Sequence, residues 1–190
     1  MSNGSFSFGK FYKDSKQTLF QPKAYFAEME ISGGLGEPIL KALVYGVIAG
    51  IFILIWSLLD IIGVTAGSNS GNDAVVGFFG TIIGAVVGVF VAGLIIMALS
   101  YICSGNKNYE ANMRVAASIM VVLPVSSILG FFGGISYVLG AVIALLVHLY
   151  GVYMLYNALV STLKGDQKPA KAISYILGVL LVIFAIIGLV

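Results

Sequence analysis

The chain has 190 residues, of which 59% are hydrophobic and only 9% are charged, and its mean hydropathy is +1.05. A water-soluble domain carries roughly a quarter charged residues, so this composition excludes a soluble protein and indicates an integral membrane protein. The net charge of +2 gives no reason to expect a nucleic-acid partner, and the single cysteine, Cys103, excludes an internal disulfide and a cysteine-based metal cluster.

The N-terminal region divides into two parts. Residues 1–18 are polar and lack the apolar core of a cleavable signal peptide, so we expect a mobile cytoplasmic tail. Residues 19–36 predict a short amphipathic interfacial helix followed by the glycine-rich linker "SGGLG". Pro22 suits the first turn of this helix, where a missing N–H is not needed.

The predicted interfacial helix has one apolar face. Tyr25, Phe26 and Met29 recur at helical spacing, while Lys23 lies on the opposite side with acidic neighbours. A helix of this kind lies in the membrane interface with its apolar face inserted. We therefore expect four membrane-surface residues: Lys23 near the headgroups, and Tyr25, Phe26 and Met29 in the leaflet.

From residue 37 onward the chain is almost wholly apolar and predicts a five-helix membrane domain over 37–190. A bilayer core about 30 Å thick needs roughly 20 helical residues to cross it. Polar stretches separate the spans, and Gly133-Gly134 is expected to form a tight turn. The predicted fold is all-α, a polytopic membrane protein with five transmembrane helices preceded by the amphipathic helix; the spans cover about 38–64, 74–103, 114–132, 135–161 and 172–190.

The positions of the basic residues predict the topology. With the N-terminus inside, all 10 Lys and Arg residues fall on the inner side and the two outer loops hold none, which is the positive-inside pattern. The C-terminus is then outside. Two pairs at i, i+4 spacing, Glu37–Lys41 and Glu110–Arg114, are expected to be local ion pairs only.

Small residues recur at every fourth position in three predicted spans, a pattern that lets membrane helices approach closely. We interpret these positions as packing sites within the five-helix bundle, in preference to a dimer face, and crosslinking would distinguish the two. They are Gly46 and Gly50 in the first span, Gly80, Gly84 and Gly88 in the second, and Gly140 in the fourth, continued by His148.

His148 and Pro124 are the two features of the spans that point to chemistry. His148 is expected to face a neighbouring helix, and a neutral, hydrogen-bonded structural role is preferred to proton coupling, because no acid lies in the middle of any span. Pro124 predicts a kink in the third span that frees a carbonyl near Met120. Broken helices can build transport sites, which leaves transport as an alternative.

Several segments resemble the Yip1-domain family of five-span membrane proteins over about residues 19–190. They include a "P-x-x-x-F" element at Pro22 to Phe26, the run "RVAASIMVVLPVSSILG", the span end "LYGVYMLYNAL" and the loop "GDQKPAKA". The resemblance implies a five-span fold with a cytoplasmic N-terminus. A longer N-terminal region and a "DLxGP"-like element are absent, so it points to a prokaryotic inner-membrane member and does not carry over binding of Rab-type GTPases.

The sequence carries no catalytic set, no metal-ligand cluster and no phosphate-binding glycine loop, so we expect no enzyme activity, no cofactor and no metal. The leading hypothesis is a non-enzymatic membrane scaffold or adaptor that associates with another membrane protein or with itself, or organises lipid. The alternative is a small-solute or ion transporter or channel that uses His148 and the Pro124 kink. No nucleic acid is expected as a partner.

Overall fold

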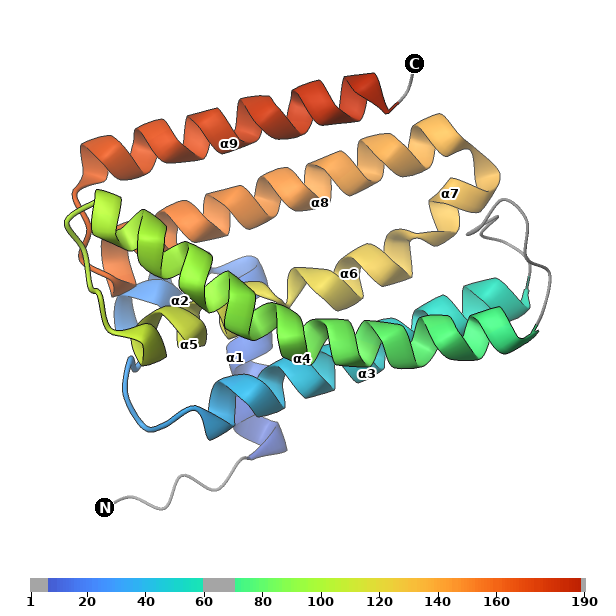
Figure 1. Ribbon diagram of the computed structural model, residues 1–190, viewed down its shortest axis with the longest axis horizontal. Helices are drawn as coiled ribbons and strands as arrows, with labels where there is room; N and C mark the ends of the chain where they lie inside the picture. Colours follow the sequence, from blue (N-terminus) through green and yellow to red (C-terminus); the bar gives the residue numbers. More distant parts are fainter. Residues whose placement is uncertain (1–6, 60–70, 189–190) are drawn as a thin grey trace.

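The computed structural model describes residues 7–59 and 71–188. All regular structure in these residues is helical, and the spans run side by side along the long axis of the molecule (Figure 1). The predicted all-α fold, with five spans preceded by an N-terminal helix, is confirmed; residues 60–64 of the predicted first span lie outside the described residues. The observed spans are Gly36–Leu58, Ala74–Ile102, Tyr109–Ile135, Tyr137–Thr162 and Gln167–Ile187.

The first two spans, α3 (Gly36–Leu58) and α4 (Gly71–Ile102), form a closely packed pair. A Cβ atom added at Gly46 would lie 2.8 Å from the Cβ of Ala85, and one at Gly50 would lie 3.1 Å from the carbonyl oxygen of Phe78. Both positions therefore need glycine, because any side chain would push α4 away. In the absence of a hydrophobic drive between helices in lipid, such backbone proximity supplies the van der Waals contact that holds the pair together.

The third span consists of three helices in succession: α5 (Tyr109–Ile119), α6 (Val122–Leu129) and α7 (Phe131–Ile135). It begins five residues before the predicted 114, because the Asn108 side chain accepts a hydrogen bond from the Ala111 N–H at 3.3 Å and caps α5. The break between α5 and α6 is at Met120 and Val121, one turn before Pro124. A proline ring displaces the carbonyl four residues earlier, which accounts for the position of the break.

The tight turn predicted at Gly133-Gly134 is not there, because both residues are inside α7. The chain reverses at Ser136, whose backbone is extended and whose side chain caps α8 (Tyr137–Asn157). Gly133 instead allows α7 and α8 to approach closely, because a Cβ added at Gly140 would lie 2.6 Å from the Cα of Gly133. The two glycines let α7 fold back tightly on α8.

The C-terminal hairpin consists of α8, a π-helical turn η1 (Ala158–Thr162) and α9 (Gln167–Ile187). The loop between η1 and α9 pairs with the loop between α4 and α5. The Asp166 N–H donates to the Cys103 carbonyl at 2.6 Å, and the Asn106 N–H donates to the Leu163 carbonyl at 2.7 Å. These bonds join the two connections at one end of the bundle.

All 10 Lys and Arg residues of the chain lie at this same end, where α3, α5 and α9 begin and where α4 and η1 end. We call it the basic end. Its cations are Lys10, Lys13, Lys16, Lys23, Lys41, Lys107, Arg114, Lys164, Lys168 and Lys171.

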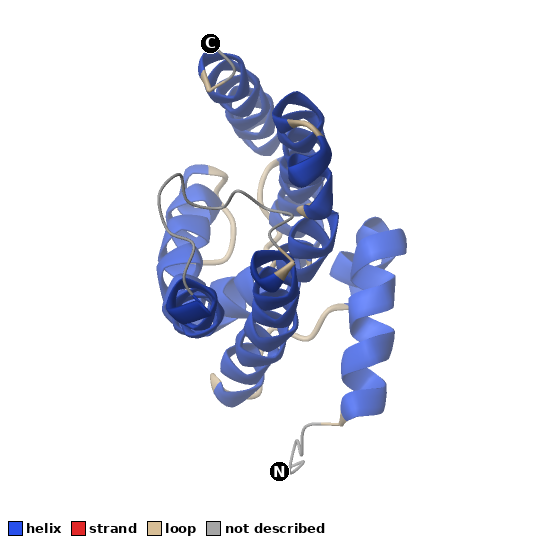
Figure 2. Ribbon diagram, turned by 90° about the vertical axis from the view of Figure 1, so that its right-hand side faces the viewer, coloured by secondary structure: helices blue, strands red, loops and turns tan. Residues whose placement is uncertain are grey.

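Two helices precede the first span, α1 (Phe8–Phe20) and α2 (Pro22–Glu28). The expected tail over residues 1–18 therefore needs correction, since residues 8–18 belong to α1. The helix forms because Phe11, Ser15 and Thr18 recur at helical spacing and turn one face toward the bundle. α1 runs across the direction of the spans and stands at the edge of the bundle (Figures 1 and 2).

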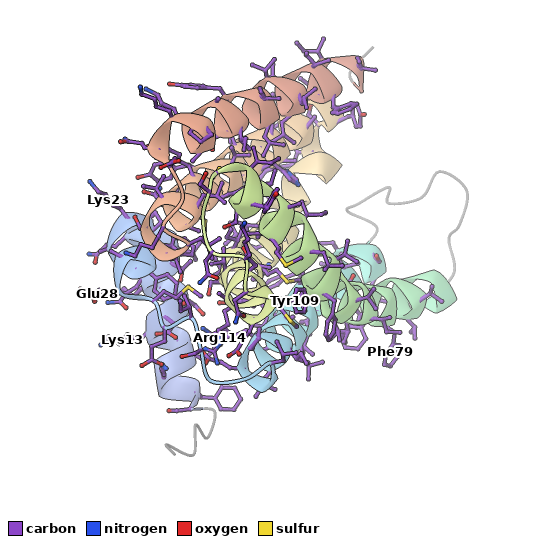
Figure 3. All side chains as sticks on the ribbon, turned by 60° about the vertical axis from the view of Figure 1, so that its left-hand side comes forward. Lys13, Lys23, Glu28, Phe79, Tyr109 and Arg114 are labelled. Carbon is purple, nitrogen blue, oxygen red and sulfur yellow. The ribbon has the colours of Figure 1, made fainter. Side chains whose placement is uncertain are left out.

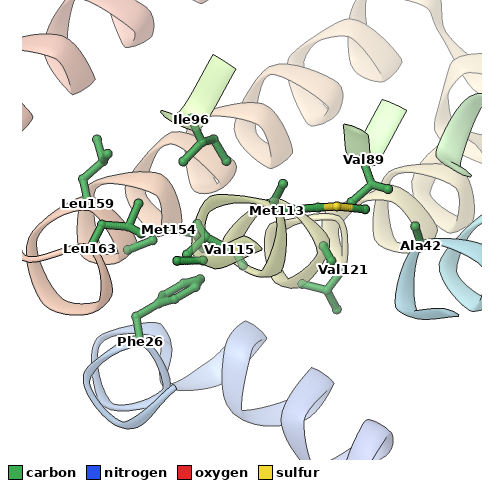
Figure 4. Packing of buried hydrophobic residues seen from close by; sticks show 14 of the residues in the cluster. Phe26, Ala42, Val89, Ile96, Met113, Val115, Val121, Met154, Leu159 and Leu163 are labelled. Atoms are coloured by element: carbon green, nitrogen blue, oxygen red, sulfur yellow. The ribbon is translucent and has the colours of Figure 1, made fainter. Parts of the chain in front are cut away.

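The core is concentrated around α5, whose residues Ala111 to Ser118 are buried in eight consecutive positions. Phe26 of α2 points into this core toward Val115, with Met154 and Leu163 beside it (Figure 4). The last two spans are the least buried. In the most apolar stretch of each span, the buried share is 33% in the first span and only 6% in the last.

Candidate functional site

Arg114 is the centre of a polar site at the basic end. Its side chain is only 5% exposed, yet it contacts three segments of the chain. The guanidinium donates to Glu37 at 2.8 Å, to Glu110 at 3.3 Å and to the carbonyl oxygen of Gly34 at 3.1 Å. A buried arginine is tolerable because charged partners and a carbonyl satisfy its donors together.

Glu37 joins Arg114 to a second buried cation, Lys41. One carboxylate oxygen of Glu37 lies 2.8 Å from Arg114 and the other lies 3.0 Å from the ammonium of Lys41. The carboxylate is also in the first turn of α3, where the helix dipole favours a negative charge. Glu37–Lys41 and Glu110–Arg114 are thus not only local pairs, as the sequence predicted; Glu37 links them into one network.

Lys41 extends the network to α1. Its side chain is 7% exposed and lies 3.3 Å from the Asp14 carboxylate. One turn further along α3, the Tyr45 hydroxyl lies 2.8 Å from the Ser15 hydroxyl of α1, and the rings of Tyr45 and Phe11 are 5.0 Å apart between centroids. The inner face of α1 is therefore attached to α3 by an ion pair, a hydrogen bond and a ring contact.

α2 is attached to the bundle by both polar and apolar contacts. The Tyr25 hydroxyl lies 3.0 Å from the Ser118 hydroxyl and 3.4 Å from the Lys41 ammonium. Phe26 is fully buried, and its carbonyl accepts a hydrogen bond from the Thr162 hydroxyl of η1. α2 therefore closes the basic end of the bundle between α5 and η1.

The linker between α2 and α3 wraps around Arg114. Gly33 and Gly34 have φ angles of +128° and +91°, which favour glycine. The Gly34 N–H donates to Glu110 at 2.6 Å, and a Cβ added at Gly33 would lie 2.7 Å from an Arg114 nitrogen. The glycine-rich stretch is thus a shaped part of the site and not only a spacer.

A pocket of about 180 Å³ opens between these elements. Its walls carry both signs of charge, with acids from α1, α2, the linker and α3, and with the two buried cations, Lys41 and Arg114, among the cations. Figure 3 shows Arg114 among the helices, whereas Lys13, Lys23 and Glu28 point outward from the N-terminal pair. The residues lining the pocket are Lys10, Asp14, Gln17, Tyr25, Glu28, Met29, Glu30, Glu37, Pro38, Lys41 and Arg114.

The expected insertion of the α2 residues into lipid needs correction. Phe26 has no exposed surface, and the half-buried Tyr25 is held by Ser118, whose hydroxyl also lies 3.9 Å from the Met29 sulfur. Their apolar face turns toward α5 because the protein interior offers the same apolar surroundings as the leaflet, together with a hydrogen-bond partner. Lys23 is exposed, so only this residue keeps a surface position.

The predicted packing residues have different surroundings. Gly46, Gly50 and Gly140 are at close helix contacts, as described above. Gly80, Gly84 and Gly88 have no other part of the described chain within 4 Å of an added Cβ, so this stripe does not pack inside the bundle. The four-residue spacing of small residues is the same on α3 and on α4. Spacing alone therefore cannot predict which of the two glycine stripes packs against another helix of the bundle.

His148 is exposed on α8, on the side that borders a cavity shared with α4, α5 and α6. Its Nδ1 lies 2.6 Å from the Ala144 carbonyl of its own helix. The ring borders an apolar cavity of about 240 Å³, whose other walls include Met120 at the α5–α6 break and Ser126 on α6. Among the described residues, no group of three or more His, Cys, Asp or Glu side chains could hold a metal ion.

The family model described as the Yip1 domain matches residues 16–189, nearly the whole chain. The chain belongs to the Yip1 domain family. This membership confirms the resemblance that the sequence motifs suggested and, with the five apolar helices, it makes the chain an integral membrane protein of the Yip1 type. Comparisons with curated proteins and with solved structures gave no match.

Proposed function

We propose that this Yip1 domain protein is a non-enzymatic membrane adaptor that presents its N-terminal helices to another membrane protein. The observation that supports this role is the network from Asp14 through Lys41, Glu37 and Arg114 to Glu110, in which both cations are buried and the acids are partly buried. Burying several charges gives little net stability. Their directional pairing does fix one pose of α1 and the linker on the bundle, which is what a presented surface requires.

The surface that this pose presents is the outer face of α1. Tyr12, Lys16 and Phe20 follow one another at four-residue spacing and are exposed, Tyr12 at 71% and Phe20 at 75%. Large aromatic side chains next to a cation form the kind of surface that protein partners bury as anchors. Lipid headgroups are the competing occupant, because aromatic and basic residues also suit a membrane interface.

The open glycine stripe on α4 is the second contact that we assign to the adaptor. Gly80, Gly84 and Gly88 offer a smooth backbone surface within the membrane, and in this they differ from Gly46, which α4 already covers. A small-residue face allows a helix of another protein, or of a second copy, to approach closely. Gly84→Leu should therefore leave the fold intact and weaken association, whereas Gly46→Leu should disrupt the α3–α4 pair itself.

Photo-crosslinking in native membranes tests the proposal. A photoreactive amino acid is placed at Tyr12, at Gly84 or, as a control, at Phe184, which is 67% exposed on α9. The proposal expects a discrete protein adduct from Tyr12 or Gly84 and none from Phe184, with the partner identified by mass spectrometry. Adducts with lipid alone would replace the adaptor with a lipid-organising role, and adducts with a second copy would identify a homo-oligomer.

The orientation belongs to the same proposal. The basic end should face the cytoplasm of a prokaryotic inner membrane, because the positive-inside rule places Lys and Arg there. A Lys16→Cys variant, in a Cys103→Ser background, should react with a membrane-impermeant maleimide only after the cells are broken. Labelling of intact cells would contradict this orientation.

A transporter is the second candidate, supported by the cavity that brings His148 next to the broken third span. In this version His148 and the freed carbonyl region near Met120 would handle a proton or a small polar solute. His148→Gln should then abolish uptake by liposomes that contain the purified chain. Unchanged uptake in the variant would rule out a role for His148 in transport, and no uptake by the unaltered protein would leave the adaptor as the sole candidate.

A further inference from the structure

A groove between α8 and α9 opens at the basic end and has a volume of about 580 Å³. This is within the range of roughly 300–1,000 Å³ that small-ligand sites occupy. Its position is explained by weak packing of α9, in which Ala170 is the only residue recorded as buried. It is lined by Leu149, Val152, Tyr153, Tyr156, Lys171, Ser174, Tyr175, Gly178, Val179, Val182 and Ile183.

The lining residues are polar at one end of the groove and apolar along the rest of it. Lys171, Ser174 and three tyrosines come from the parts of α8 and α9 near the basic end, whereas Gly178 to Ile183 are wholly apolar. The ammonium of Lys171 lies 5.8 Å from the centre of the Tyr175 ring. Lys171 forms no ion pair in the part of the chain that the structure describes, so its charge is available at the mouth of the groove.

The length of the groove matches one leaflet. Along α9, the twelve helical steps from Lys171 to Ile183 span about 18 Å at 1.5 Å per residue. Half of a hydrocarbon core about 30 Å thick is roughly 15 Å. With Lys171 and the tyrosine hydroxyls at the headgroup level, the apolar end of the groove therefore reaches the middle of the bilayer.

We propose that this groove is a binding site for an anionic phospholipid, with one acyl chain along Val179, Val182 and Ile183 and the phosphate at Lys171. The charge of Lys171 favours an anionic lipid, because no acidic residue lines the groove beside it. A membrane-exposed apolar groove alone would accept any lipid; the unpaired ammonium favours a net negative headgroup. This inference is independent of the adaptor proposal, whose surfaces are on α1 and α4.

The test uses the full chain in nanodiscs that contain equal parts of phosphatidylglycerol and phosphatidylcholine, and native mass spectrometry counts the lipids that remain bound. The unaltered chain should retain phosphatidylglycerol in preference. Lys171→Ala should lower that retention about fivefold, the effect of one basic residue near an anionic surface, and Lys171→Arg should restore it. Val182→Trp should remove both lipids by filling the groove.

Two matched variants serve as controls. Lys107 is also a cation over a tyrosine at the basic end, 4.3 Å from the centre of the Tyr101 ring, but it does not line the groove. Lys107→Ala should leave the lipid count unchanged, as should Ile83→Trp on the exposed face of α4. The proposal fails if Lys107→Ala and Lys171→Ala lower retention equally, if both lipids are retained equally, or if Val182→Trp has no effect.

Discussion

α5 and α9 both belong to the membrane domain, yet they are packed in opposite ways. α5 buries eight consecutive residues and carries the buried charge of Arg114, whereas α9 has a single buried residue, Ala170. α5 is fixed by directional polar contacts with α2, α3 and the linker. α9 is attached mainly to α8, with apolar contacts and a groove between them. Polar pairing thus holds together the half of the protein around α5, whereas the half around α9 buries little of its own surface.

The largest expected effect of a substitution comes from Arg114. Arg114→Ala leaves Glu37, Glu110 and the Gly34 carbonyl without their shared donor. Breaking a fully buried pair costs about 3–5 kcal/mol, and the cost here should be at or below the lower end of that range because the two carboxylates are 29% and 28% exposed. We expect the melting temperature in detergent to fall and protease to cut near Lys16. Lys171→Ala on α9 removes a cation at the same end but should change neither measurement; equal effects of the two variants would contradict the comparison.

Phe26 gives an effect of similar size. Phe26→Ala removes a fully buried ring from the contact of α2 with α5 and η1, which typically costs about 3–5 kcal/mol but less where the site can collapse. The melting temperature should fall markedly. Phe184→Ala, a change of the same size on the exposed side of α9, should leave it within error. A tolerated Phe26→Ala would restore the interpretation that this ring lies in lipid.

Gly33 should have a smaller effect. Gly33→Ala combines an unfavourable positive φ with a Cβ 2.7 Å from Arg114, so a loss of about 1–3 kcal/mol is expected. Gly34→Ala has only the backbone penalty, because nothing lies within 4 Å of its added Cβ. Thermal unfolding of the two variants separates these contributions. On α9, Gly178→Ala should be tolerated, since its Cβ would meet Leu149 at an ordinary 3.7 Å.

Hydropathy was sufficient to predict the five spans, because a span depends on composition over about 20 residues. The family was predicted from short motifs spread along the chain. The ionic network could not be predicted from the sequence, because Glu37 and Arg114 are 77 positions apart. Each already had a partner of opposite charge at i, i+4 spacing, so nothing indicated that the two pairs would meet. Phe26 was assigned to lipid for a related reason. An apolar helix face has the same pattern whether a leaflet or a protein core covers it.

The smallest effect concerns Cys103. Burial, with the nearby Asp166 carboxylate as a lesser cause, raises the pKa of its thiol. Near neutral pH, a smaller fraction of Cys103 is therefore in the reactive thiolate form than for an exposed thiol. The folded state keeps the thiol neutral until the pH rises through the raised pKa. Maleimide should label Cys103 slowly at pH 7 and faster as the pH increases. Lys168→Cys at the start of α9 should react rapidly; comparable rates would show that Cys103 is accessible.

The π-helical turn at Ala158–Thr162 implies a phase shift between two parts of one span. An α-helix advances about 100° per residue, so the wider turn changes the direction of every side chain after it. Few residues of α8 are buried before the turn, whereas Leu159 and Thr162 within it and Leu163 directly after it are buried at the contact with α2 and the core. Deleting one residue there would rotate Thr162 away from the Phe26 carbonyl. The span therefore cannot be shortened by even one residue without loss of this hydrogen bond.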